Sequence, residues 1–198
     1  IDVINWARNS YSNWKLDYLL AINLYGKGRY KESKTILSKI GEESLNPIFY
    51  LNRGVIFQKN GIDPLNDFNK AYHLDNKNWR VSKSLSNYFY DLGNYKKANK
   101  ILERSYENDI SNYIIGMDYV KSLVKLKKYE LAISTLKNLN ILPYEHAGEG
   151  RELYSNSYIG LALENIKKSK FKSAIDILYE SKKWPENLGV GKPYNPDE

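Results

Sequence analysis

The feature that most constrains this chain is a short pattern that recurs at a fixed interval. Residues 92–102 read LGNYKKANKIL, and residues 126–136 read LKKYELAISTL. Tyr95 and Tyr129 lie 34 residues apart (129 − 95), and Ala98 and Ala132 keep the same interval. A fixed interval of this size is typical of structural units that cannot bury an apolar face alone and stack on their neighbours to do so. We therefore expect an array of units rather than one globular core.

Four copies of the pattern share one spacing of turn, aromatic, small and apolar positions. They are Gly28, Tyr30, Ser33, Leu37 and Ile40; Gly93, Tyr95, Ala98, Leu102 and Ser105; Lys127, Tyr129, Ala132, Leu136 and Leu139; and Ser169, Phe171, Ala174, Leu178 and Ser181. Residues three and four apart share one face of a helix, so each copy predicts a buried stripe on the second helix of a pair. An interval near 34 residues is that of the tetratricopeptide repeat (TPR). The predicted fold is an all-α right-handed superhelix, an α-solenoid of stacked helix-turn-helix units.

Each copy follows a first helix with a stripe of its own. These stripes are Leu20, Ala21 and Leu24; Leu85, Ser86 and Phe89; Tyr119, Val120 and Leu123; and Leu161, Ala162 and Asn165. Gly28 and Gly93 mark the turn where a first helix ends. Lys127 and Ser169 occupy this position in the other two copies, and we expect those turns to form without a helix-ending residue.

A fifth copy is irregular. Gly54 and Gly61 keep the spacing of a first helix, but the stretch from Gly61 to Ala71 is about two residues short, and Pro64 suits the first turn of the shortened helix. Residues 1–13 resemble the tail of another second helix, as expected of a cut through a longer array. The chain is thus predicted to be a single TPR-like domain with a remnant at 1–13, about five repeats near 14–46, 47–78, 79–112, 113–146 and 155–188, and a tail at 189–198.

Composition narrows the classes of partner. The formal net charge is +7 over 198 residues, but the Lys residues are scattered among Glu, Asp and Asn, as on a solvated surface, so we expect no nucleic-acid partner. No apolar run approaches the roughly 18 residues of a membrane span, so we expect no membrane partner. Cys is absent, which excludes thiolate metal sites and slightly favours a cytoplasmic compartment. The start shows neither a signal peptide nor an initiator Met, so the compartment is left open.

The interval lengthens in the segment 142–153, LPYEHAGEGREL, where Pro143, Gly148 and Gly150 predict a loop. Four titratable side chains lie close together there: Glu145, His146, Glu149 and Glu152. A metal or acid–base site is one interpretation. A single His among glutamates is more typical of a loop that caps one helix pair and begins the next.

In the tail, Trp184 and Pro185 are expected to end the last helix. Gly189 and Gly191 do not follow a strand, so they do not predict a phosphate loop. The sequence predicts no catalytic residue, no metal and no cofactor, and hence a chain that is not itself an enzyme.

Two longer motifs carry a family resemblance. The first is read at Leu142, Pro143, Glu145, His146, Ala147, Glu149, Gly150, Leu153 and Tyr154. The second, WPENLGVGKPY, runs unbroken over 184–194. With the segment 13–30, these motifs make the chain resemble, over essentially its whole length, the C-terminal TPR region of large bacterial proteins that place a domain of unknown function ahead of the repeats. The upstream domains of such proteins resemble carbohydrate-active β-sandwich modules, so the resemblance implies a link to glycan metabolism.

The leading functional hypothesis is a protein–protein or interdomain interaction scaffold. The first helices of stacked pairs line a concave surface that commonly receives peptides or another domain. Its expected lining is Lys15, Tyr18, Ile22 and Tyr25; Arg80, Lys83, Asn87 and Tyr90; and Met117, Lys121 and Lys125. A groove rich in Lys and Tyr favours an acidic or C-terminal peptide.

Lys83 and Asn87 have the spacing of the carboxylate clamp of chaperone-binding TPR domains, but Asp118 departs from that clamp in the next unit. The alternative hypothesis is a structural accessory region of a larger carbohydrate-active enzyme, packed on its upstream domain. The predicted partner is therefore a protein or peptide, including the upstream domain of the same chain.

Overall fold

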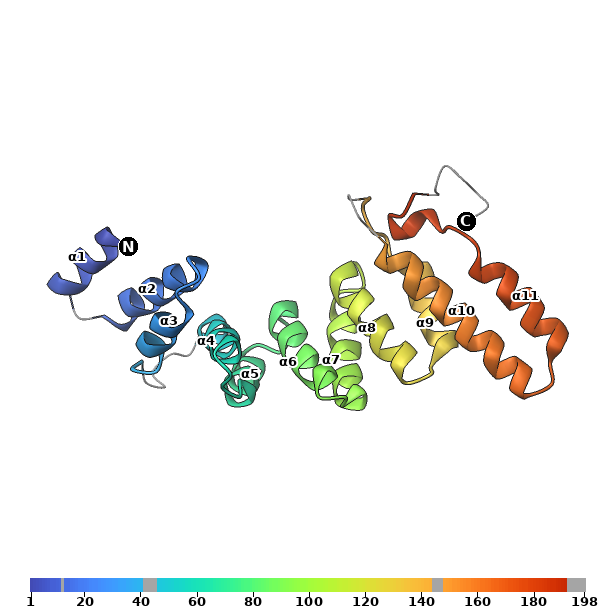
Figure 1. The fold of residues 1–198 in the computed structure, drawn as a ribbon, viewed down its shortest axis with the longest axis horizontal. Coiled ribbons are helices and arrows are strands. Elements are labelled where there is room, and N and C mark those ends of the chain that lie inside the picture. Colours follow the sequence, from blue (N-terminus) through green and yellow to red (C-terminus); the bar gives the residue numbers. More distant parts are fainter. Residues whose placement is uncertain (12, 41–45, 144–147, 192–198) are drawn as a thin grey trace. The chain divides into compact units, whose positions relative to one another are not determined.

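The computed structural model describes residues 1–11, 13–40, 46–143 and 148–191, and these residues form eleven α-helices and one 3₁₀ helix (Figure 1). The chain divides into two compact units, Ile1–Tyr88 (unit 1) and Phe89–Glu198 (unit 2), which are treated separately below. None of the described helices has the length and apolarity needed to cross a membrane. The prediction of an all-α array of helix-turn-helix pairs is confirmed.

Unit 1 consists of a short first helix followed by helix pairs. Its helices are α1 (Asp2–Ser10), α2 (Trp14–Gly26), α3 (Tyr30–Leu37), α4 (Pro47–Lys59), α5 (Leu65–Leu74) and most of α6 (Trp79–Asp91). Helix α2 packs on α3 and α4 packs on α5, while α3 and α2 both contact α4. The pair α2–α3 thus stacks on the next pair chiefly through its second helix, as the repeat predicts.

Unit 2 continues the same plan from the end of α6. Its other helices are α7 (Tyr95–Asn108), α8 (Tyr113–Lys125), α9 (Tyr129–Asn138), α10 (Glu149–Lys167), α11 (Phe171–Ser181) and the 3₁₀ helix η1 (Glu186–Leu188). Helix α8 packs between α7 and α9, and α10 packs on α8, α9 and α11 (Figure 1).

The turn between the helices of each pair has one backbone geometry in all five repeats. The turn residues, each with positive φ, are Gly28 (75°), Gly61 (74°), Gly93 (73°), Lys127 (59°) and Ser169 (57°). In every case the next N–H donates to the carbonyl five residues earlier, at 2.8–3.0 Å, which is the Schellman helix end. The expectation that two turns lack a helix-ending residue is therefore wrong, because Lys127 and Ser169 adopt the left-handed conformation themselves.

The predicted stripes are buried inside the array but not at its C-terminal end. The small and apolar positions of α3, α7 and α9 are buried, including Ser33, Ala98 and Ala132. In α11 only Ala174 and Ser181 are buried, whereas Phe171 and Leu178 are exposed. A second helix buries its stripe only when a further helix lies across it, and no described helix covers this face of α11.

The irregular repeat of unit 1 is held by a buried ion pair that the sequence did not predict. Arg53 donates to both carboxylate oxygens of Asp67, at 2.6 and 2.9 Å, and both residues are buried. The neighbouring Gly54 lies so close to the ring of Phe68 that a Cβ would come within 2.6 Å of it. Pro64 precedes the first helical residue of α5, one position earlier than expected.

The lengthened segment before α10 contains less loop than predicted. Helix α10 begins at Glu149, so Gly150 is helical and buried rather than part of a loop. A Cβ at Gly150 would lie 3.1 Å from Leu188, so this position packs tightly against the closing segment. Glu145, His146 and Ala147 lie outside the described residues, as do residues 192–198 of the tail.

The two motifs of the family resemblance pack against each other. The backbone N–H of Ile141 donates to the carbonyl of Asn187 at 2.8 Å. The amide nitrogen Nδ2 of Asn187 donates to the carbonyls of Leu136 and Leu139, at 2.9 and 2.7 Å. Helix α11 ends at Ser181, and η1 then follows Pro185. The closing motif thus ties the end of α9 to the start of α10 and stabilises the longer first helix.

Candidate functional site

Four predicted groove residues lie on α2 in unit 1, and one of them, Ile22, is half-buried. Lys15 is exposed. The hydroxyl of Tyr18 accepts a hydrogen bond from Asn52 Nδ2 at 2.6 Å, so this tyrosine links α2 to α4. Tyr25 packs on Tyr30 across the turn, with ring centroids 5.3 Å apart.

Three more predicted residues lie on α6 in unit 1. The guanidinium of Arg80 stacks over the ring of Trp79, 4.4 Å from its centroid. Lys83 is half-buried, and Asn87, one turn further along the helix, is exposed. The structure does not bring these α6 residues together with those of α2.

Unit 2 gathers the remaining predicted residues into one site. The ring of Tyr90, at the end of α6, packs edge-on against Tyr95 at the start of α7, with centroids 5.0 Å apart. Lys125 Nζ, from the end of α8, lies 5.9 Å from the centroid of Tyr95. Burial raises the pKa of the Tyr90 hydroxyl, and the neighbouring Tyr95 raises it further. We call Tyr90, Tyr95 and Lys125 the unit 2 triad.

A group of three charges borders the triad. Lys121 Nζ lies 3.3 Å from Asp118 and 2.5 Å from Glu149. Burial would lower the pKa of Lys121, but the hydrogen bond to Glu149 and the charge of Asp118 together raise it. Lys121 therefore stays protonated and its charge is offset by two carboxylates, so this part of the surface is less basic than predicted. Met117, expected to line the groove, is instead buried in the core.

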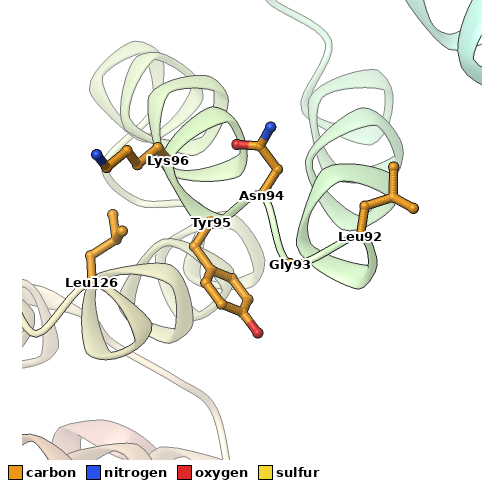
Figure 2. Close-up of a pocket in the computed structure, with 6 residues that line it drawn as sticks. All are labelled: Leu92, Gly93, Asn94, Tyr95, Lys96 and Leu126. Atoms are coloured by element: carbon orange, nitrogen blue, oxygen red, sulfur yellow. The ribbon is translucent and has the colours of Figure 1, made fainter.

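A shallow pocket of about 430 Å³ opens beside Tyr95 (Figure 2). Its lining consists of Leu92, Gly93, Asn94, Tyr95, Lys96 and Leu126. In Figure 2 the ring of Tyr95 lies between the α6–α7 turn and Leu126, the residue that follows α8. Asn94 caps α7 by accepting from the N–H of Lys97, and Gly93 supplies the left-handed turn. The wall is thus formed by a helix start, a tight turn and the end of a neighbouring helix.

Several residues of this site were missed from the sequence. Tyr95 was assigned to the repeat pattern, although it follows Tyr90 by five residues just as Tyr30 follows Tyr25, and that recurrence could have identified it. Asp118 was noted only as a departure from the clamp. Glu149 was considered only for a metal or acid–base site, because its partner Lys121 lies in another repeat.

The described residues hold no group of three or more His, Cys, Asp or Glu that could bind a metal ion. Of the four residues considered for a metal or acid–base site, Glu149 pairs with Lys121 and Glu152 is exposed. The other two lie outside the described residues.

The chain is similar in fold to several solved structures. One is YrrB, described as a TPR protein with an unusual peptide-binding site, with 14% identity, a TM-score of 0.67 and 90% of each chain covered. Another is MamA from Desulfovibrio magneticus RS-1, residues 41 to the end, with 15% identity, a TM-score of 0.60 and coverage of 86% of this chain and 94% of that chain. A third is MamA AMB-1, with 15% identity, a TM-score of 0.61 and coverage of 85% and 89%.

No protein-family model matches the chain, and no curated protein is similar to it at a significant level. The similarity to solved structures therefore establishes the fold.

Proposed function

We propose that this chain, which has the tetratricopeptide-repeat fold, is a protein-interaction scaffold whose unit 2 binds a peptide segment of a partner protein. The observation that carries the proposal is the unit 2 triad beside an open pocket of about 430 Å³. Tyrosine rings supply contact area at low cost in conformational entropy, which suits them to peptide recognition. The peptide-binding site named in the description of YrrB supports a peptide ligand on this fold.

The chemistry of the site narrows the class of peptide. The pocket has apolar walls at Leu92 and Leu126 and a volume large enough to admit an apolar side chain. Lys96 and Lys125 are exposed at its edge, and each could meet a carboxylate. We therefore expect the peptide to carry an apolar anchor residue close to an Asp, a Glu or its own C-terminus.

The alternative function, an accessory region of a carbohydrate-active enzyme, rests on the family resemblance alone. None of the similar structures reported above is described as such an enzyme. The upstream domain of the same chain remains one proposed source of the bound segment.

The experiment is a selection of random displayed peptides on the purified chain, followed by calorimetric titration of the enriched sequences. The informative variant is Leu126→Asn, because Asn60 holds the equivalent helix-end position in unit 1 with similar backbone angles (φ −99° against −85°). The change should fold normally, make the pocket wall polar and weaken peptide binding by about tenfold.

The matched control is Leu131→Asn, the same change at an exposed leucine of α9 outside the pocket, which should leave the affinity within about twofold. Lys125→Glu should remove the preference for acidic peptides. Failure to enrich any sequence, or equal binding to wild type and Leu126→Asn, would contradict the proposal.

A further inference from the structure

The pair α10–α11 carries an uncovered apolar face. Six large apolar side chains on it are each between 37% and 60% exposed: Ile159, Leu163, Ile166, Phe171, Ile175 and Leu178. On α10 they recur at intervals of four and three residues, and on α11 at the same intervals, so each set forms one helical stripe. Contiguous exposed apolar surface of this kind commonly marks an interaction site.

The repeat register identifies what this face is built to receive. Aligning the turn residues Ser169 and Lys127 places Phe171, Ile175 and Leu178 on the positions that Tyr129, Ile133 and Leu136 hold in α9. Helix α9 packs on α10, with Tyr129 against Gly160, and Ile133 and Leu136 are buried. The same type of surface is therefore covered by a helix in one repeat and left bare in the next.

The existing interface also shows the shape of the covering helix. Gly160 of α10 lies so close to the ring of Tyr129 that a Cβ there would come within 2.2 Å of it. The aromatic residue that begins the second helix thus receives a small residue from the helix that covers it. Phe171 occupies the position equivalent to Tyr129, so we expect a glycine or alanine opposite it in a helix that covers it.

The closing tail does not supply this helix within the described residues. Leu188 packs on Gly150 at the start of α10, and Asn187 bonds to the end of α9. Both contacts lie at the opposite end of α10 from its turn with α11. Around that turn the exposed side chains include Lys167, Lys168, Lys170 and Lys172, which favour negative charge in a partner.

We propose that the α10–α11 face binds an acidic amphipathic helix of a partner protein, with Gly or Ala opposite Phe171, in continuation of the interface between α9 and α10. The binding mode is a helix laid across an apolar groove. This surface is separate from the unit 2 triad, and the proposal does not rest on the peptide site.

The test uses the helix that already fits the equivalent surface. A synthetic peptide with the sequence of Glu149–Lys167 is titrated into the whole chain by calorimetry. An i, i+4 lactam between Glu152 and a lysine in place of Asn156, both exposed in α10, offsets the cost of helix nucleation. We expect binding with a dissociation constant in the micromolar range. The chain variant Ile175→Glu should weaken it by about tenfold or more, and so should the peptide change Gly160→Leu.

The control variant is Leu131→Glu, which places the same charge at an exposed apolar position of α9 outside the face; its affinity should match wild type within about twofold. No binding, or equal binding by the Gly160→Leu peptide, would overturn the proposal. If sedimentation shows that the chain self-associates and that Ile175→Glu abolishes this self-association, the occupant of the face is a second copy of the chain instead. Binding seen only after truncation at Gly191 would assign the face to residues 192–198.

Discussion

The two units build the same aromatic–lysine arrangement at the same repeat positions, and they differ in what lies beside it. In unit 1 Tyr25 packs on Tyr30 at 5.3 Å, and Lys59 lies 5.4 Å from the ring of Tyr30. In unit 2 Tyr90 packs on Tyr95 at 5.0 Å, and Lys125 lies 5.9 Å from the ring of Tyr95. The repeat therefore copies a side-chain arrangement as well as a backbone.

One helix-end residue accounts for the difference. In unit 1 this residue is Asn60, whose Nδ2 donates to the carbonyl of Tyr30 at 3.2 Å and to that of Ile56 at 2.8 Å. In unit 2 it is Leu126, which cannot donate from its side chain and instead lines the pocket beside Tyr95. The polar residue thus links the end of α4 to the start of α3, whereas the apolar residue lines an open pocket.

The largest expected effect concerns the buried ion pair of unit 1. Asp67→Asn leaves the buried guanidinium of Arg53 without its carboxylate, and we expect a loss of about 3 kcal/mol in the free energy of unfolding of unit 1. Hydrogen exchange resolved by peptide should show faster exchange in α4, the helix that carries Asn60, and little change in unit 2.

The control for this prediction is Glu32→Gln, which removes a carboxylate from the exposed pair with Arg29. It should leave exchange in α4 unaltered. If hydrogen exchange in α4 is unchanged in Asp67→Asn, the ion pair does not stabilise α4.

The prediction of intermediate size concerns the stability of unit 2, whose pocket depends on packing between α7 and α8. There Tyr119 stacks on Tyr106 at 5.7 Å and donates to Glu103, and burial, aided by Glu103, raises the pKa of Tyr119 to about 12. The folded state then holds this proton more tightly than the unfolded chain. The resulting stabilisation is complete below pH 10, the ordinary tyrosine value, and is lost as the pH rises towards 12.

Urea unfolding followed by circular dichroism should therefore show a loss of about 1–2 kcal/mol between pH 9 and pH 11.5. Tyr119→Phe should make this pH dependence shallower, although it lowers stability at pH 8 by about 1 kcal/mol through loss of the hydrogen bond. An equally steep dependence in Tyr119→Phe would exclude this tyrosine as the source.

The smallest effect concerns the turns. Unit 1 uses glycine at both of its left-handed turns, whereas unit 2 uses Lys127 and Ser169 at two of its three. Lys127→Gly should relieve the steric cost of a side chain at positive φ and stabilise the protein by about 0.5 kcal/mol, the remainder of that cost being offset by the greater freedom of glycine in the unfolded chain.

Lys128→Gly is the matched control, because φ at Lys128 is −87° and glycine gives no relief there. Thermal unfolding of the two variants in parallel should move the midpoint in opposite directions. A lower midpoint for Lys127→Gly would show that its side chain contributes more than its strain costs.

Much of the fold could be predicted because its signals are local. The left-handed turns at Gly28 and Gly93 and the buried small residues of the second helices follow from spacing within one repeat. The start of α10 could not be predicted in the same way. Gly150 reads as a loop residue until Leu188, far along the chain, is seen to pack against it.

The same distinction, between local signals and contacts of residues far apart in the sequence, applies to the candidate site. Tyr90, Lys121 and Lys125 were found from their register on the first helices, but the pairing of Lys121 with Glu149 was not. The predicted residues of unit 1 do not form a comparable site, and whether any of the predicted groove residues binds a ligand stays a prediction.

The sequence by itself determined the helix pairs, their turns and the residue types at each repeat position, because these depend on contacts within about 34 residues. The tertiary structure alone decided that Arg53 and Asp67 share a buried pair, that Leu126 lines a pocket beside Tyr95, and that the stripe of α11 is left bare. Each of these outcomes depends on which helices pack against each other and how closely they approach. The hydrophobic periodicity of the sequence specifies neither.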